Sequence, residues 1–142
     1  MKKIIIVFLT ALFIVGGCSF FQQIEKDEAA LTAVKIAAKR IGYAVAKNNP
    51  RHTAEIIAYA ELLANMGDSE KLVKEALPLA LAALDKFVAD PIVQSDIKDV
   101  AAMIKLNIPD VEIAVKSKLA RAALEGFIEG CKLAQELSGE RQ

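Results

Sequence analysis

Three prolines and a glycine divide a long run of helix-favouring sequence into segments of limited length. The breakers are Pro50, Gly67, Pro91 and Pro109, and between them apolar side chains recur three and four positions apart, which is the period of one helix face. Proline cannot continue a helix, and glycine commonly ends one. No stretch alternates as a strand would. The sequence therefore predicts an all-α fold, a compact bundle of four to five helices joined by short loops.

The breakers also set the expected helix limits. We expect helices over residues 23–47, 50–66, 69–89, 90–106 and 110–137. Asn49 is the expected cap of the second helix, Asp68 or Ser69 of the third, and Asp90 of the fourth. Pro78 lies inside the third helix, which predicts a kink or break near Leu77. The third helix is apolar on so much of its surface that we expect a central element covered on several sides.

The composition excludes several classes of protein. Hydrophobic residues make up 54% of the chain, and tryptophan is absent, which indicates a packed helical protein and not a disordered tether. The 18 basic and 18 acidic side chains lack the basic excess of a nucleic-acid binder. His52 is the only histidine, and no metal, nucleotide or catalytic motif accompanies it. We therefore predict no enzymatic activity, no cofactor, no metal and no nucleic-acid partner.

The first 18 residues have the organisation of an export signal. Lys2 and Lys3 form a basic start, residues 4–15 are apolar except for one threonine, and two glycines precede Cys18. This order is that of a cleaved signal peptide. The apolar run is shorter than the roughly 20 residues that a membrane-spanning helix needs.

The four residues Val15-Gly16-Gly17-Cys18 resemble the lipobox of bacterial lipoproteins. The resemblance implies attachment of a diacylglyceryl group to the Cys18 sulfur, cleavage before Cys18 and acylation, for example with palmitate, of the new N-terminus. Two or more acyl chains hold a protein on a membrane lastingly. Ser19 after the cysteine resembles the outer-membrane sorting pattern of enteric lipoproteins. The alternatives are an ordinary secretory signal with an incidental cysteine, or an uncleaved anchor.

This interpretation divides the chain into four parts. Residues 1–17 would be the signal peptide, 18–22 a short lipidated tether, 23–138 a single helical domain, and 139–142 a frayed C-terminus. The length of the third part is sufficient for one domain with its own core.

A group of basic residues surrounds the end of the first helix and the start of the second. This basic corner comprises Lys35, Lys39, Arg40, Lys47, Arg51 and His52, and its candidate anion contacts are Lys39, Arg40, Lys47 and Arg51. They could be a solvated face whose charges complement a helix C-terminus. They could also contact anionic lipid headgroups or a phosphate-bearing partner.

Small residues recur at four-residue spacing in the last helix. This small-residue ridge comprises Ala122, Gly126, Gly130 and Ala134, with Phe127 beside it. Glycine inside a helix costs about 1 kcal/mol relative to alanine, so close approach of another helix should compensate. That helix could belong to the same chain, for example at Gly42, or to a second copy or an envelope protein partner.

Cys131 is the second cysteine of the chain. If Cys18 carries lipid, Cys131 is a lone thiol. It could be a buried small apolar residue, or it could form an intermolecular disulfide or react as a free thiol.

These features favour an envelope lipoprotein, held by lipid on the periplasmic face of the outer membrane, that acts as a non-catalytic binding, scaffold or interaction protein. One alternative is a carrier that holds a small apolar ligand between its helices, with the break at Pro78 as its opening. A carrier needs a cavity of about 300 Å³ or more. Another alternative is a phage- or mobile-element-encoded envelope lipoprotein that blocks entry or modulates lysis.

Overall fold

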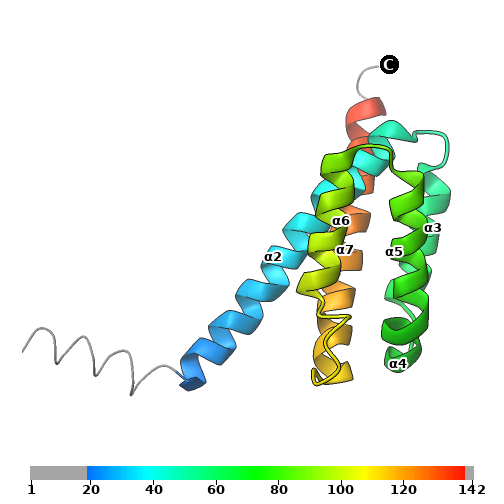
Figure 1. Cartoon of the computed structure of the whole chain (residues 1–142). Helices are drawn as coiled ribbons and strands as arrows, with labels where there is room; N and C mark the ends of the chain where they lie inside the picture. The colour runs from blue at the N-terminus through cyan, green and yellow to red at the C-terminus, as the bar shows by residue number, and fades with distance from the viewer. Residues whose placement is uncertain (1–18, 140–142) are drawn as a thin grey trace, which may run out of the picture. The chain divides into compact units, whose positions relative to one another are not determined.

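The computed structural model of the chain describes residues 19–139, and their side chains from residue 28 onward. The predicted signal peptide and Cys18 lie outside the described residues. The all-α prediction is confirmed, since no strand occurs in the described part (Figure 1). The helices are α2 (Ser19–Asn48), α3 (Thr53–Ala64), α4 (Ser69–Lys71), α5 (Leu77–Phe87), α6 (Pro91–Met103) and α7 (Ile113–Gly139), with a π-helical segment (Leu72–Ala76) between α4 and α5.

The chain separates into two units, residues 1–30 and residues 31–142, and the boundary falls within α2. In the first unit, the described residues 19–30 are helical. The second unit contains the remainder of α2 and all the other helices. The contacts and sites described below all lie in the second unit.

Aspartate caps begin two of the helices as the sequence predicts. The Asp68 carboxylate accepts a hydrogen bond from the Lys71 backbone N–H at 3.0 Å, and this cap opens α4. The Asp90 carboxylate accepts one from the Ile92 N–H at 2.8 Å, and Pro91 follows at the first position of α6. Both bonds satisfy N–H groups that have no partner inside their helix.

The start of α3 differs from the prediction. The helix begins at Thr53, not at Pro50, and Asn49 is not its cap. The Asn49 side chain instead donates to the Val45 carbonyl at 2.9 Å, which closes the end of α2. The Asn49 carbonyl accepts from the His52 N–H at 3.1 Å, so residues 50–52 form a turn before α3.

The predicted break near Leu77 is present as a change of helix type. The π-helical turn Leu72–Ala76 comes directly before α5, in which Pro78 occupies the second position. Proline has no N–H and disturbs the preceding turn of an α-helix. A π-helical turn, with its wider hydrogen-bonding pattern, accommodates that disturbance while the chain stays helical.

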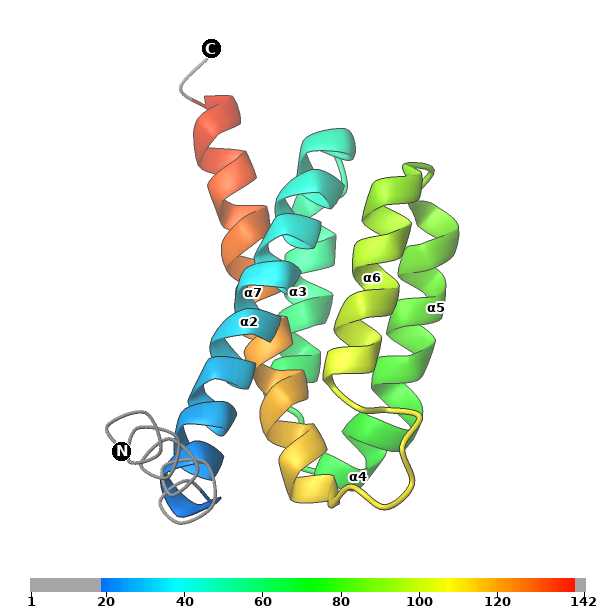
Figure 2. The ribbon, with the colours of Figure 1, turned by 60° about the vertical axis from the view of Figure 1, so that its left-hand side comes forward.

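The core of the second unit is aliphatic and draws on α2, α3, α6 and α7. Its fully enclosed members include Val34, Ala120 and Ile104. Figure 2 shows α5 beside α6, and α3 beside α7.

Glycines bring α2 and α7 into backbone contact. A Cβ atom on Gly126 would collide with the Lys35 carbonyl, one on Gly130 with the Lys39 carbonyl, and one on Gly42 with the Phe127 carbonyl. Gly42, Gly126 and Gly130, here called the glycine seam, are all buried.

The glycine seam decides between the two interpretations of the small-residue ridge. Gly126 and Gly130 are covered by α2 of the same chain, and Ala122 and Phe127 are partly buried against the core. The intramolecular alternative is therefore the one observed. A self-association or partner surface centred on these glycines would have to displace α2, which already occupies the face.

Ion pairs border the glycine seam. Lys35 Nζ lies 2.8 Å from Glu129 Oε1, and Lys39 Nζ lies 3.7 Å from Glu129 Oε2. The hydrogen bond from Lys35 lowers the pKa of Glu129, and the same bond raises the pKa of Lys35. These side chains are exposed, so their attraction is screened by water and salt, and it is the close contact at the glycines that dominates.

The third predicted helix is buried in its first half, at Leu72 and Val73, but along α5 it is not the covered central element that its apolar sequence suggested. Leu77 is the one buried residue of α5. Leu79 is 69% exposed and Phe87 is 50% exposed. An apolar helix with so little cover is unusual in a folded protein, and the reason lies in the cleft described below.

We expect Gly130→Ala to destabilise the protein by about 1–3 kcal/mol, because the added methyl group overpacks a backbone contact. In an ordinary helix interior the same change is stabilising by about 1 kcal/mol, so the sign is diagnostic. Urea denaturation followed by circular dichroism measures the difference.

Gly67→Ala is the matched control, since nothing lies within 4 Å of a Cβ atom at Gly67 and its φ is not positive. It should leave stability unchanged or raise it by up to about 1 kcal/mol. A Gly130→Ala protein as stable as the Gly67→Ala protein would contradict the close contact of α2 and α7.

Candidate binding cleft

An apolar cleft of about 630 Å³ opens between α3 and α5. One wall is the face of α3 from His52 to Leu63, and the facing wall is α5 from Leu77 to Phe87. The floor is formed by α2, α6 and α7, through Ala38, Ile41, Val100, Ile104, Ala123, Leu124 and Phe127. The cleft therefore reaches from the exposed edges of two helices into the core.

The α3 wall is fixed to α7. Arg121 on α7 donates to the carbonyl of Ala64, the last residue of α3, and at 2.6 Å to the carbonyl of Met66, two residues beyond it. Lys132 of α7 also pairs with Glu61 of α3 at 3.0 Å. The guanidinium bonds satisfy carbonyls that have no partner within a helix that ends there.

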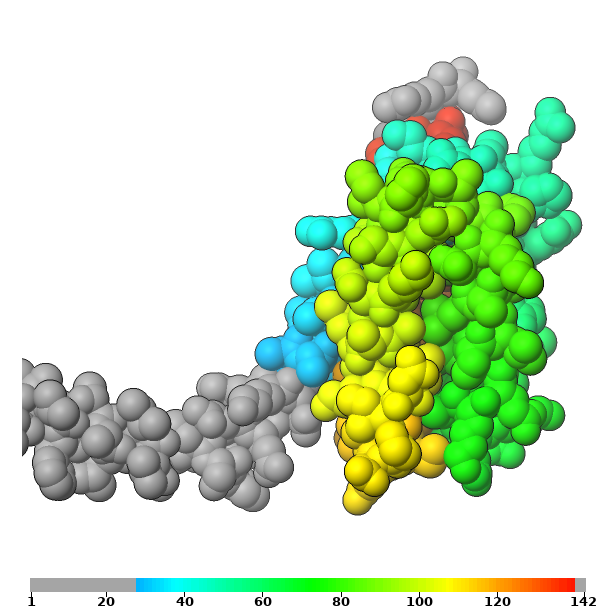
Figure 3. Space-filling view, viewed as in Figure 1, coloured from blue at the N-terminus to red at the C-terminus, as the bar shows by residue number. Residues whose placement is uncertain are grey.

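The α5 wall is held by its neighbour α6. Gln94 of α6 donates to the Val88 carbonyl at 2.7 Å and to the Asp85 carbonyl at 3.3 Å. Figure 3 shows α5 and α6 next to each other on the molecular surface. Within residues 28–139, no hydrogen bond or ion pair joins α3 to α5. The two walls are thus attached to different parts of the bundle.

Small side chains keep the cleft open. Five of the lining residues are alanines: Ala38, Ala60, Ala80, Ala83 and Ala123. They come from α2, α3, α5 and α7, so every one of those elements contributes space that a leucine would fill.

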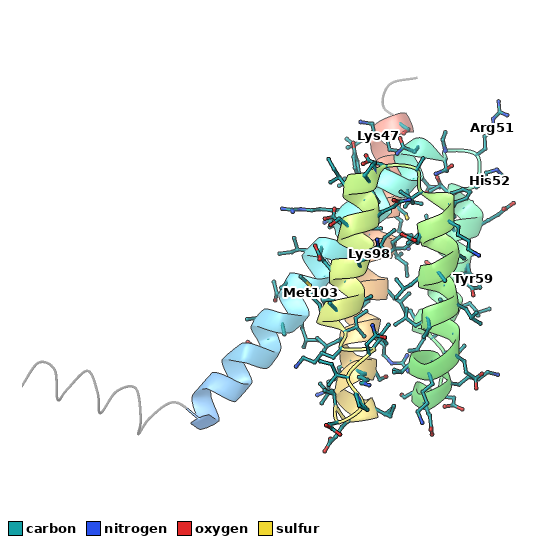
Figure 4. All side chains as sticks on the ribbon, viewed as in Figure 1. Lys47, Arg51, His52, Tyr59, Lys98 and Met103 are labelled. Atoms are coloured by element: carbon teal, nitrogen blue, oxygen red, sulfur yellow. The ribbon has the colours of Figure 1, made fainter. Side chains whose placement is uncertain are left out.

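The polar groups of the cleft lie on α3 or directly before it. His52, Glu55 and Tyr59 are the lining residues with polar side chains, and their spacing of three and four places them along one edge of the helix. His52 Nδ1 lies 3.5 Å from Glu55 Oε2. Tyr59 is 53% exposed, and Figure 4 shows it on the same side of the molecule as His52. These three residues are here called the polar lip.

The residues of the basic corner differ in their surroundings. Lys39 is paired with Glu129, and Lys47 Nζ lies 5.9 Å from the centre of the Tyr43 ring. Arg51 projects outward beside His52, whereas Lys47 is at the end of α2 (Figure 4). Arg40 is exposed. Contact of this corner with anionic headgroups or a phosphate-bearing partner stays a prediction.

Cys131 is buried at the packing contact of α7 with α2. Its thiol is inaccessible to solvent and donates to the Gly42 carbonyl at 3.3 Å. Burial raises the pKa of this thiol to about 12. The thiol therefore stays protonated at neutral pH, which favours the buried apolar alternative over a reactive one.

Sequence reasoning did not find the residues of the cleft. It placed an opening at the break near Pro78, but Pro78 does not line the cleft. The available signal was the apolar surface of residues 77–87, which is too broad for a helix with one buried face. Such a surface predicts burial, whereas in the structure it forms the wall of a cleft.

Neither a metal site among the described residues nor similarity to a known protein indicates a function for this chain. Among the described residues, no group of three or more histidine, cysteine, aspartate or glutamate side chains is placed to hold a metal ion. No helix in that part of the chain has the length and apolar character needed to span a membrane. Comparisons with protein-family models, curated proteins and solved structures gave no match.

We expect Cys131 in the folded protein to resist alkylation by iodoacetamide at pH 8, because the thiol is buried and its pKa is raised. The same residue should be alkylated rapidly in urea. Mass spectrometry of the peptide that contains Cys131 reports the modification. Equal rates in the two conditions, or a disulfide between two copies of Cys131, would show that the thiol is accessible.

Proposed function

We propose that this protein is a lipid-anchored envelope protein whose helical unit binds a small apolar ligand in the cleft between α3 and α5. The observation that carries the proposal is the cleft itself, an open volume of about 630 Å³ lined almost entirely by aliphatic and aromatic side chains. Pockets that bind small molecules typically measure about 300–1,000 Å³ and are mostly apolar. The cleft meets both criteria.

The lining supports binding without catalysis. A reaction needs polar groups directed at the reacting atoms, and the floor of the cleft carries none. His52 and Glu55 are exposed at the mouth, where water weakens their effect on a bound molecule. Release of water from an apolar surface is the driving force that such a site offers.

The anchor is proposed from the sequence of the first 18 residues. The basic start, the apolar run and Val15-Gly16-Gly17-Cys18 together support lipidation of Cys18 and a position at the bacterial cell envelope. Ser19 supports the outer membrane. A binding unit placed on a membrane has immediate access to apolar molecules, which fits the apolar cleft.

A second candidate function is suggested by the mouth of the cleft. Tyr59, Leu79 and Phe87 are all at least half exposed around it. Exposed apolar side chains flanking a groove can receive the apolar face of a partner helix. In that case the protein would be an interaction protein, and small apolar molecules would bind the cleft weakly or not at all.

We expect Cys18→Ser to abolish membrane attachment, because the thiol that would carry the diacylglyceryl group is removed. The product should stay in the aqueous fraction when membranes are sedimented or partitioned into detergent. The unsubstituted protein should begin at residue 18 and carry added fatty-acid mass. A mature protein that starts at Cys18 without that mass would end the lipoprotein interpretation.

We expect the chain from residue 18 onward, carrying Cys18→Ser, to bind the fluorescent apolar probe N-phenylnaphthylamine with an emission increase. Ala80→Phe should remove most of the binding, because Ala80 lines the cleft and a phenyl ring would fill it. Ala82→Phe is the matched control, since Ala82 is exposed on the same helix and does not line the cleft.

Circular dichroism establishes that both variants are folded. A probe that fails to bind the unsubstituted chain, or that binds the Ala80→Phe and Ala82→Phe variants equally, would contradict the proposed site.

A further inference from the structure

We infer that the ligand of the cleft is an amphiphile with a single alkyl chain, such as a fatty acid or a lysophospholipid, whose head group remains in water at the polar lip. This inference rests on the proposed function, which it makes chemically specific. It follows from where the polar groups of the cleft lie, from the shape of the apolar part and from how the walls are held.

The distribution of polar groups limits the ligand to molecules that are polar at one end. Away from the polar lip, every lining side chain is a hydrocarbon. A sugar, a nucleotide or an amino acid would leave hydroxyl, phosphate or amide groups without partners inside, and each such group costs several times the gain from one buried methylene. An alkyl chain has no such groups. Its single polar end can remain at the polar lip.

The lining also distinguishes an alkyl chain from a flat aromatic ligand. Most lining residues are alanine, leucine, isoleucine and valine, from five different helices. Phe87 stands half exposed at the mouth and Phe127 lies on the floor, so the two phenyl rings do not form one stacking platform. The remaining surface is irregular and aliphatic, which suits a flexible chain.

The volume favours one chain over two. About 630 Å³ lies in the middle of the range for drug-sized ligands. A phospholipid with two acyl chains is about twice as large as a fatty acid and would have to leave one chain in water or spread the walls.

The charges at the mouth indicate that the chain, and not the head group, is recognised. Besides the Tyr59 hydroxyl, the polar side chains among the lining residues are His52 and Glu55, whose Nδ1 and Oε2 atoms lie 3.5 Å apart. Both side chains are exposed to water, which screens their charges and leaves little basis to select an anion or a cation. Carboxylate, hydroxyl and phosphocholine heads on the same chain should therefore bind alike.

The attachment of the walls provides a route of entry. No bond of the described residues joins α3 to α5, while α3 is fixed to α7 and α5 to α6. The mouth between them can widen without breaking a polar contact between α3 and α5, so an alkyl chain can enter lengthwise between the two helices.

The test uses the mature chain from residue 18 with Cys18→Ser, which contains every described residue, and displacement of N-phenylnaphthylamine. Octanoate, laurate and palmitate should displace the probe with Kd values that fall by about fourfold per added methylene, equivalent to about 0.8 kcal/mol, until the cleft is full. Palmitate, hexadecanol and palmitoyl lysophosphatidylcholine should differ by less than the effect of one methylene. Equal Kd values for octanoate and palmitate, or a strong preference among the heads, would overturn the inference.

The failure of the inference is distinguishable from failure of the proposed function. If the probe binds and is displaced by other apolar molecules but by no alkyl amphiphile, the cleft is a binding site and the assigned ligand class is wrong. If a diacyl phosphatidylcholine competes as well as palmitate, the single-chain assignment is wrong. If the probe does not bind at all, the proposed function fails first.

A pair of adjacent substitutions locates the chain. Ala83 and Ala82 are both exposed on α5, but only Ala83 lines the cleft. Ala83→Trp should weaken palmitate binding by about tenfold or more, which corresponds to lost contact with roughly two methylenes. Ala82→Trp should leave the Kd unchanged. Since both positions face solvent, neither variant should unfold, and equal affinities would show that the chain does not pass between α3 and α5.

Discussion

The backbone contact between α2 and α7 at the glycine seam is the constraint on which the rest of the helical unit depends. Glycine allows the two helices to approach until carbonyls of one meet the Cα atoms of the other. At that distance the pair has one register, because a shift along either helix would bring a side chain against a backbone. The other helices then pack on a fixed pair. Cys131 beside Gly42 fills the remaining space with a small, protonated side chain.

The other helices differ in how they are attached to the fixed pair of α2 and α7. Polar bonds from Arg121 and Lys132 attach α3 to α7, so α3 belongs to the rigid part of the unit. The π-helical turn Leu72–Ala76 and α4 contact α7. The following helix, α5, is instead hydrogen-bonded to Gln94 of α6 and has a single buried side chain. One wall of the cleft is consequently bonded to the α2–α7 pair, whereas the other is bonded to α6.

The local features of the fold were predictable because short-range chemistry determines them. Asp68 and Asp90 cap helices since their carboxylates reach the nearest free N–H groups, and Pro78 disturbs the helix where it stands. Gly126 and Gly130 predict a close helix contact, although the sequence alone leaves open whether the contacting helix belongs to the same chain. Asn49 is not the cap that the sequence predicts, because α3 begins at Thr53 and not at Pro50, and the Asn49 side-chain NH₂ donates to a carbonyl at the end of α2. The cleft could not be predicted, because it depends on how far α5 lies from α3.

The cleft is costly to keep empty, and that cost supports a role for it. Each Å² of apolar wall left in water lacks about 25 cal/mol of hydrophobic stabilisation that burial would provide. Larger residues in place of the lining alanines would bury that surface. The chain has instead small residues on the walls and floor, and an apolar helix, α5, with one face uncovered. A ligand that covers those surfaces would return the missing stabilisation to the folded state. The closely packed pair of α2 and α7 allows the cleft to remain open, because it holds the floor of the cleft in place and leaves the volume above the floor free for a ligand.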